Sequence, residues 1–172
     1  RINRAFMTLG KCNKVLVHSQ DETELLNNIC RAIVEIGGHS FAWVGYAGKD
    51  KNKTVHPIAH FGNGKDYFSE VRITWMDNQW GNTPMGSAIR SGRASVSKDI
   101  INDPAYSPFL KNIKNSGFVS SVAFPLIIDD KTIGALNIYS KELDAFDERE
   151  FILLSELSKD LSYGIKSLRT RK

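Results

Sequence analysis

Near the start of the chain, four apolar residues and one polar residue recur at intervals of four and three: Ile2, Phe6, Leu9, Asn13 and Leu16. This spacing predicts an amphipathic helix. Either the helix lies on its own domain, or it forms a dimer seam in which Asn13 fixes the register. We therefore divide the chain into a helical connector or dimer helix at 1–18, a globular domain at 19–165 and the start of a second connector at 166–172.

Two further helices carry capping signals. Asp21 and Asp147 are each followed three residues later by a glutamate, which is the spacing of a capping box. Gly37 ends the first of these helices. The second continues toward the end of the chain with leucines at heptad-like spacing: Leu154, Leu157, Leu161 and Leu168. Together with the first helix, this seam predicts a homodimer through the terminal helices.

Four apolar runs predict strands that pair as two antiparallel hairpins: 41–47 with 53–61, and 119–128 with 131–140. Pro57 marks its strand as an edge strand or as the site of a bulge. Asp129 and Asp130 form a two-residue turn, so the second hairpin is the clearest in the chain. Its nearly continuous apolar character indicates central strands that are covered on both faces. Residues 71–75 are a candidate for one more short strand.

Glycine and proline punctuate the stretch between the hairpins. Pro84 and Gly92 predict the first turn and the end of a short helix. Further helical turns are predicted to begin at Asp103-Pro104 and to end at Gly117.

The order of these motifs resembles a GAF domain. The resemblance extends from about 20 to 165 and rests on these segments: 86–92 (GSAIRSG), 97–100 (SKDI), 118–125 (FVSSVAFP), 133–138 (IGALNI) and 146–148 (FDE). It implies an α+β, PAS-like fold with a central antiparallel sheet of about six strands. The terminal helices would pack on one face of the sheet, and a ligand pocket would lie on the other. It also implies a sensor module within a larger signalling protein.

Charge and composition limit the classes of partner that we expect for this chain. The formal net charge of the 172-residue chain is +4, but the first 20 and the last seven residues hold eight of the 23 Lys and Arg and none of the 19 Asp and Glu. The domain between them is therefore net negative, which argues against a nucleic-acid partner. No apolar run is long enough to span a bilayer, so we expect no membrane contact in this segment. With two cysteines and no CxxC motif, a cytoplasmic location is expected.

The sequence shows no recognisable catalytic motif. Cys12 and Cys30 fall on predicted helices away from the expected pocket, and GxSxG, HExxH and P-loop patterns are missing. We therefore expect no enzymatic activity. We also expect no cofactor, because there is no pocket cysteine to attach a bilin and no convincing axial histidine for haem.

Seven residues are candidates for ligand contact: Trp75, Trp80, Asp99, Ser116, Ser120, Phe124 and Asn137. The two tryptophans lie in the glycine-rich stretch between the hairpins, where core packing is less natural, and an aromatic plane beside a pocket suits a flat ligand. The resemblance to cyclic-nucleotide-binding GAF domains implies Ser116, Ser120 and Asn137. Asn137 also interrupts an apolar strand, where a buried amide needs a partner.

We therefore expect a regulatory domain that binds a small ligand, with cAMP or cGMP the best match to the resemblance. Binding would be relayed through the terminal helices to a covalently linked output domain, such as a diguanylate cyclase or a histidine kinase. The alternative is a ligand-free dimerisation or interaction module, whose pocket would be packed shut by Trp75, Trp80 and Phe124.

Overall fold

The fold is built around one antiparallel sheet. The computed structural model describes residues 2–64 and 72–171 of the chain. Within them the sheet has five strands in the order β2-β1-β5-β4-β3. Their bounds are β1 Phe41–Ala47, β2 Val55–Gly62, β3 Ser95–Ser97, β4 Ser120–Ile128 and β5 Lys131–Ser140. The expected α+β architecture is confirmed, and both expected hairpins are present.

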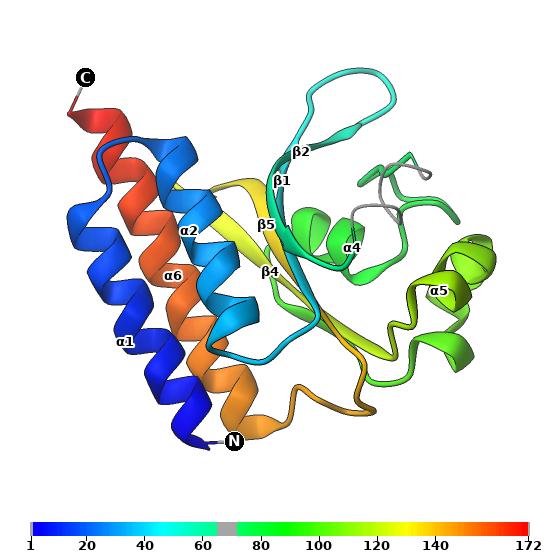
Figure 1. Cartoon of the computed structure of the whole chain (residues 1–172). Helices are drawn as coiled ribbons and strands as arrows, with labels where there is room; N and C mark the ends of the chain where they lie inside the picture. The colour runs from blue at the N-terminus through cyan, green and yellow to red at the C-terminus, as the bar shows by residue number, and fades with distance from the viewer. Residues whose placement is uncertain (1, 65–71, 172) are drawn as a thin grey trace.

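Helices cover the two faces of the sheet unequally, as Figure 1 shows. Three long helices cover one face: α1 (Ile2–His18), α2 (Glu22–Glu35) and α6 (Glu148–Thr170). Short elements lie on the other: α4 (Pro84–Ser91), η1 (Ile100–Asn102), η2 (Pro104–Phe109) and α5 (Leu110–Ser116). The sheet therefore separates a helical layer from a loop layer.

Each layer has its own hydrophobic core. Because successive residues of a strand point to opposite faces, β4 and β5 contribute to both. Phe124 and Ile138 belong to the core under the long helices. Ala123 and Tyr139 belong to the core on the loop side, which also contains Trp43. This division decides which strand residues can face a ligand in the loop layer.

Local sequence signals set the helix ends. The carboxylate of Asp21 accepts the N–H of Glu24 at 2.8 Å, and Asp147 accepts that of Glu150 at 3.0 Å. Both predicted capping positions are confirmed. The short helix α4 ends at Gly92 with φ of 69°, a left-handed conformation that glycine adopts without strain.

The two hairpins differ in regularity. Asp129 and Asp130 both have positive φ, 51° and 65°, as a tight two-residue turn requires. Strand β2 lies at the sheet edge, and its Pro57 pairs with Gly45 where the register shifts, so both interpretations of Pro57 hold. In the expected strand 71–75, residue 71 lies outside the described residues, and Thr74 forms only an isolated bridge with Thr54.

The leucine seam of α6 lies inside the chain's own core. Its four leucines are at most 8% exposed and pack in the helical-layer cluster. The inner side of α1 contacts the same cluster through Leu9 and Leu16, which confirms that this helix lies on its own domain. Asn13 and Phe6 remain exposed on its outer side. The seams are thus explained by packing within one chain, and they do not require a dimer.

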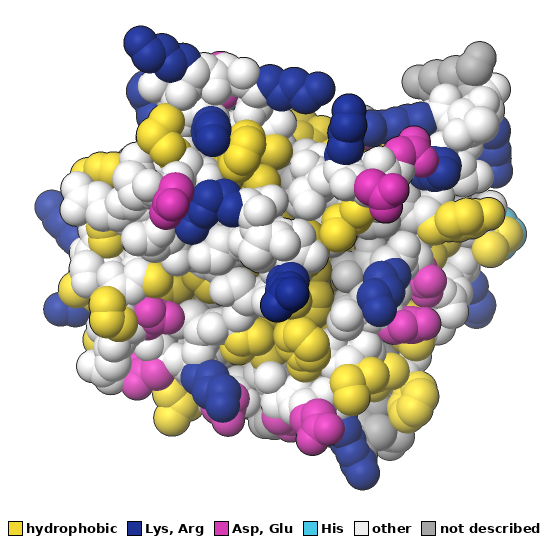
Figure 2. Space-filling view, turned by 180° about the vertical axis from the view of Figure 1, so that it is seen from behind, with side chains coloured by type: hydrophobic (Ala, Val, Ile, Leu, Met, Phe, Trp, Pro, Cys, Tyr) yellow, Lys and Arg dark blue, Asp and Glu magenta, His cyan; other side chains and the backbone are white. Residues whose placement is uncertain are grey.

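The surface carries charges of both signs. On the face seen from behind in Figure 2, lysine and arginine side chains are spread out, with acidic side chains among them. In the described part of the chain, no helix combines the length and apolar character needed to cross a membrane.

Candidate ligand-binding site

A cavity of about 510 Å³ opens in the loop layer, a size that suits a small molecule. Its walls come from the β1–β2 turn, from the segment 72–80, and from the region where η2 meets α5. Met76, Trp80 and Phe109 supply apolar surface. The polar lining includes Arg72, Thr74 and three asparagines, Asn52, Asn78 and Asn112.

Hydrogen bonds fix one wall of this cavity to the sheet. The hydroxyl of Thr74 donates to the carbonyl oxygen of Asn52 at 2.7 Å, and the N–H of Trp75 donates to that of Lys53 at 3.0 Å. The indole N–H of Trp75 donates to the carbonyl oxygen of Gly48 at 3.0 Å. The segment that begins the cavity wall is therefore bound along the β1–β2 turn.

The two candidate tryptophans have different surroundings. Trp80 lines the cavity, is 46% exposed, and meets Phe109 edge-on with ring centroids 5.8 Å apart. A partly exposed indole of this kind can stack on a flat ligand. Trp75 is half-buried, and the ammonium of Lys53 lies 4.7 Å from its ring centroid. Trp75 therefore supports the β1–β2 turn, while Trp80 is the aromatic wall of the cavity.

The described lining of the cavity carries positive charge only. Arg72 is its cationic side chain, and none of the described residues that line it is an aspartate or glutamate. Amide groups from the asparagines offer both donors and acceptors. This lining suits a neutral or anionic polar ligand better than a cationic one.

Asn137 belongs to a buried polar network on the same side of the sheet. Its amide nitrogen donates to the hydroxyl of Tyr139 at 3.0 Å, and the hydroxyls of Tyr106 and Ser121 lie 2.7 Å apart. All four residues are at most 2% exposed. Burial raises the pKa of Tyr106 well above its ordinary value, and the neighbouring Tyr139 adds to this.

One buried polar atom of this network has no hydrogen-bond partner among the described residues. This atom is the side-chain oxygen of Asn137. Such an atom in a core is costly unless something else donates to it. The sequence singled out Asn137 but missed the other members of the network.

The register of the β4–β5 hairpin corrects two candidate residues. An uninterrupted hairpin closed by Asp129 and Asp130 would pair Ser120 with Tyr139. The register instead shifts between Leu126 and Ile127, so that Ser121 pairs with Tyr139. Paired residues share a face, so this bulge turns Ser121 toward the loop layer and Ser120 away from it.

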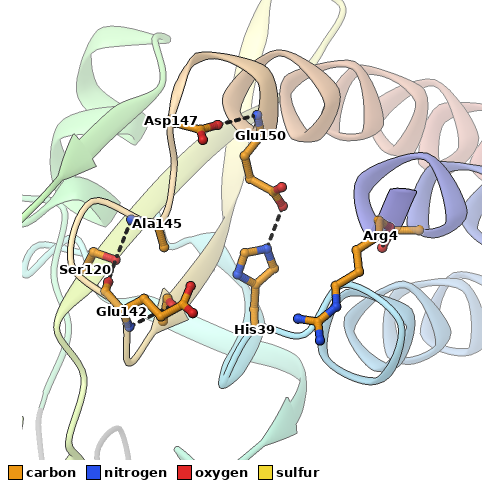
Figure 3. A network of polar contacts seen from close by, with 9 residues as sticks. Arg4, His39, Ser120, Glu142, Ala145, Asp147 and Glu150 are labelled. Atoms are coloured by element: carbon orange, nitrogen blue, oxygen red, sulfur yellow. Dashed lines mark hydrogen bonds and ion pairs between the residues drawn. The ribbon is translucent and has the colours of Figure 1, made fainter. Parts of the chain in front are cut away.

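Ser120 and Phe124 are therefore removed from the site. The hydroxyl of Ser120 donates to the carbonyl oxygen of Glu142 at 2.7 Å (Figure 3). The ring of Phe124 packs against Phe151 of α6, with centroids 5.5 Å apart. The expected pocket closure by Phe124 fails for the same reason, because this ring lies in the helical layer.

Asp99 and Ser116 make local hydrogen bonds at helix ends. Asp99 accepts from the side-chain amide of Asn102 at 2.7 Å. The hydroxyl of Ser116 donates to the carbonyl oxygen of Ile113 at 2.6 Å. Neither residue lines the cavity around Trp80.

Both cysteines lie in the helical layer, away from the cavity. Cys12 and Cys30 are free and buried. Burial raises the pKa of the Cys12 thiol to about 12, against a small lowering by Lys11, and it raises the pKa of Cys30 as well. Neutral thiols of this kind are poor nucleophiles. Among residues 2–64 and 72–171, no cluster of three His, Cys, Asp or Glu side chains is placed to hold a metal ion.

Comparisons with known proteins agree on the fold. The family described as GAF domain matches residues 19–166. A free methionine-R-sulfoxide reductase from Neisseria meningitidis, solved with its substrate, superimposes with a TM-score of 0.79 at 21% identity, covering 98% of this chain and 92% of that one. A GAF domain of a phosphoenolpyruvate-protein phosphotransferase from Coxiella burnetii gives 0.77 at 16% identity, covering 99% and 98%.

A third solved structure comes from a signalling protein. It is a domain of a protein described as a two-component sensor histidine kinase from Sinorhizobium meliloti 1021. It gives a TM-score of 0.66 at 19% identity and covers 88% of this chain and 94% of that one. A comparison with curated proteins finds no match.

The expectation that this chain is not an enzyme is corrected by these structures. A free methionine-R-sulfoxide reductase from Staphylococcus aureus, at 16% identity, shares the fold over 94% of this chain, as the one from Neisseria meningitidis does over 98%. The fold therefore carries catalysis in some proteins, and the missing motifs do not argue against activity here.

Proposed function

Because the chain belongs to the GAF domain family, we propose that it is a sensor whose cavity beside Trp80 binds a small, flat, anionic metabolite. The observation that carries this proposal is the combination of a partly exposed indole and a guanidinium in one cavity, with no aspartate or glutamate among the described lining residues. Domains with this fold occur in a phosphotransferase and in a protein described as a sensor histidine kinase, which supports a signalling role.

A cyclic nucleotide, cAMP or cGMP, is our specific proposal for the ligand. The base would stack on the face of Trp80, and the phosphate would approach Arg72. The asparagines of the lining would accept and donate hydrogen bonds at the base edge. The unpartnered oxygen of Asn137 is proposed as a second contact, for a ligand group that reaches the loop-side core.

Calorimetric titration of ligand-stripped protein with cAMP and with cGMP tests this proposal. Loss of a stacked base typically costs about 1–3 kcal/mol, so Trp80→Ala should bind roughly five- to a hundredfold more weakly. Arg72→Met should weaken binding as well, whereas Arg93→Met, an exposed arginine outside the cavity, should not. If wild-type protein gives no heat with either nucleotide, the cyclic-nucleotide proposal is wrong.

Asn137→Leu separates the second contact from the first. If binding depends on Trp80 but is unchanged in Asn137→Leu, then Asn137 has a structural role only. If both variants bind at least about tenfold more weakly, the ligand spans from the cavity to the core network.

For the relay, we propose that ligand binding changes the terminal helices and, through them, a linked output domain such as a diguanylate cyclase or histidine kinase. A homodimer would bring two such outputs together. Its support is the exposed apolar surface on the outer side of α1 and α6, where Phe6, Val17 and Tyr163 are 59%, 73% and 75% exposed. Light scattering at micromolar concentration should show twice the chain mass, and a Val17→Glu, Tyr163→Glu double variant should restore a monomer.

One observation favours the alternative of a ligand-free interaction module. Phe118 stacks on Tyr139 with centroids 4.4 Å apart, and Phe41 stacks on each of them at 6.0 Å. These rings fill part of the sheet face on which the ligand pocket was expected. A wild-type protein that binds neither nucleotide yet dimerises would support this alternative.

A further inference from the structure

Arg90 reaches from α4 to the segment that forms the aromatic wall of the cavity. Its Nη1 atom donates to three carbonyl oxygens, those of Trp75 at 3.1 Å, Met76 at 3.0 Å and Gly81 at 2.6 Å. One guanidinium therefore ties together the two ends of a short loop. The side chains of Met76, Asn78 and Trp80, which lie on that loop, line the cavity.

Hydrogen bonds within the loop and close backbone packing against α4 also restrain its conformation. The side-chain oxygen of Asn78 accepts the N–H groups of Trp80 at 2.9 Å and of Gly81 at 3.2 Å. A Cβ at Gly81 would overlap the carbonyl oxygen of Met76, and a Cβ at Gly86 would overlap that of Gly81. The loop therefore lies directly on α4, with its carbonyls turned toward Arg90.

Three carbonyl oxygens that converge on one point repel each other unless a cation or several donors lie between them. The guanidinium supplies both, because it is charged at all physiological pH values and the two N–H groups of its Nη1 atom are shared among the three oxygens. A lysine would supply the charge, but its ammonium nitrogen lies one bond nearer the main chain than Nη1 and so falls short of the three oxygens.

The packing of α4 does not depend on this contact. Its buried residues include Met85, Ala88 and Ile89, which contribute to the loop-side core. Arg90 is only half-buried and reaches to the loop rather than into that core. Loss of its side chain should therefore release the loop and leave the helix in place.

We propose that Arg90 is the positioning residue of the candidate site: it holds the loop from Trp75 to Gly81 closed before any ligand arrives, so that Trp80 already forms the cavity wall. A wall formed in advance spares the ligand the entropic cost of ordering it. The effect on ligand affinity rests on the proposed function, whereas the ordering of the loop does not.

The first experiment uses the ligand-free protein labelled with 5-fluorotryptophan. Its three ¹⁹F resonances are assigned by Trp80→Phe and Trp75→Phe. In Arg90→Met, the Trp80 resonance should move toward that of free fluoroindole and show a larger shift between H2O and D2O. The resonance of Trp43, which is fully buried, should stay in place as the reporter of the fold. An unchanged Trp80 resonance would overturn the proposal.

Two further variants make the result specific. Arg93→Met removes an exposed arginine just beyond the end of α4 and should leave all three resonances unchanged. Arg90→Lys should give a Trp80 resonance between those of wild type and Arg90→Met, because it keeps the charge on a side chain that is one bond shorter. If Arg90→Met also shifts the Trp43 resonance, the fold has changed and Arg90→Lys becomes the deciding variant. An unchanged Trp80 resonance in Arg90→Lys would then overturn the proposal.

The second experiment titrates the same variants with cAMP and cGMP. Arg90→Met should bind at least about tenfold more weakly than wild type, and Arg90→Lys should fall between them. If wild type binds and Arg90→Met binds equally well although its Trp80 resonance has moved, the positioning role is overturned. If wild type binds neither nucleotide, the proposed ligand is wrong, and the ¹⁹F spectra of the ligand-free protein still decide the role of Arg90.

Discussion

The Nε2 atom of His39 and a carboxylate oxygen of Glu150 lie 2.7 Å apart at a site where only 8% and 7% of the two side chains are exposed (Figure 3). This hydrogen bond links residues that are 111 positions apart and joins the approach to β1 to the first turn of α6. The His39 ring also stacks on Phe146 at 5.1 Å. The pair therefore fixes the start of the last helix to the sheet.

The first prediction concerns this pair. Glu150→Ala should lower the free energy of unfolding by about 1–3 kcal/mol, because a buried imidazole loses its partner. Glu150→Gln, which keeps an acceptor oxygen, should lose less. Urea denaturation measures both, with Glu148→Ala, an exposed glutamate of the same helical turn, as the control. Equal stability of Glu150→Ala and wild type would show that the pair contributes nothing.

A second prediction concerns the other end of α6. The carboxylate of Glu22, at the start of α2, accepts a hydrogen bond from the hydroxyl of Tyr46. It also accepts hydrogen bonds from Nε and Nη2 of Arg169, at 2.8 and 2.9 Å. Tyr46→Phe removes one hydrogen bond to a carboxylate and should cost about 1–3 kcal/mol. Arg169→Met should cost at most about 1 kcal/mol, because the Arg169 side chain is 45% exposed and salt screens the pair. A larger loss in Arg169→Met than in Tyr46→Phe would contradict this ranking.

The third prediction is a loss of stability at alkaline pH. Burial raises the pKa of Cys12 to about 12 and also raises that of Cys30, so the folded state keeps protons that the unfolded state releases from about pH 9 upward. Stability should therefore be complete below pH 9 and should fall as pH rises toward 12.

Denaturant unfolding between pH 8 and pH 11 measures this slope. A Cys12→Ala, Cys30→Ala double variant should show a shallower slope, although its stability at neutral pH is lower. The buried phenols of Tyr46 and Tyr106, whose pKa values burial also raises, contribute equally to both proteins. Identical slopes for the two proteins would rule out the thiols as the cause.

The fourth prediction concerns the turn between β4 and β5. Asp130 has φ of 65°, a conformation that costs most L residues roughly 1–2 kcal/mol and glycine almost nothing. Asp130→Gly should therefore raise the free energy of unfolding by up to about 1 kcal/mol. Asp144→Gly, at another positive φ of 49°, serves as a comparison outside the hairpin. A destabilised Asp130→Gly would show that the aspartate makes a compensating contact.

Elements with local causes could be predicted from the sequence. The caps at Asp21 and Asp147 depend on residues three positions away, and the Asp129-Asp130 turn depends only on its neighbours. The bulge at Leu126 has no comparable local signal, and the resemblance that implied Ser120 does not reveal that Ser121 is the serine on the loop side. The observed register turns both Ser120 and Phe124 away from the loop layer.

The cavity depends on longer-range contacts. Trp80 was expected at a ligand site and does line the cavity, but its partner Phe109 comes from a distant helix. Arg90 carried no signal in the sequence, because its role arises from carbonyl groups, which every residue has. Residues that bind backbone atoms leave no pattern of side-chain types for sequence reasoning to detect.

The sheet also acts as a partition. Along β4 and β5, neighbouring residues such as Ala123 and Phe124 belong to different cores and share only the main chain. The effects of substitutions on opposite sides on the free energy of unfolding should therefore be additive. Residues that line the loop layer can then change without altering the packing of the long helices. For the same reason, we expect a ligand-induced change at Tyr139 to reach α6 as a displacement of whole strands. The size of that displacement would depend on the stiffness of the hydrogen-bonded sheet rather than on side-chain contacts between the two cores.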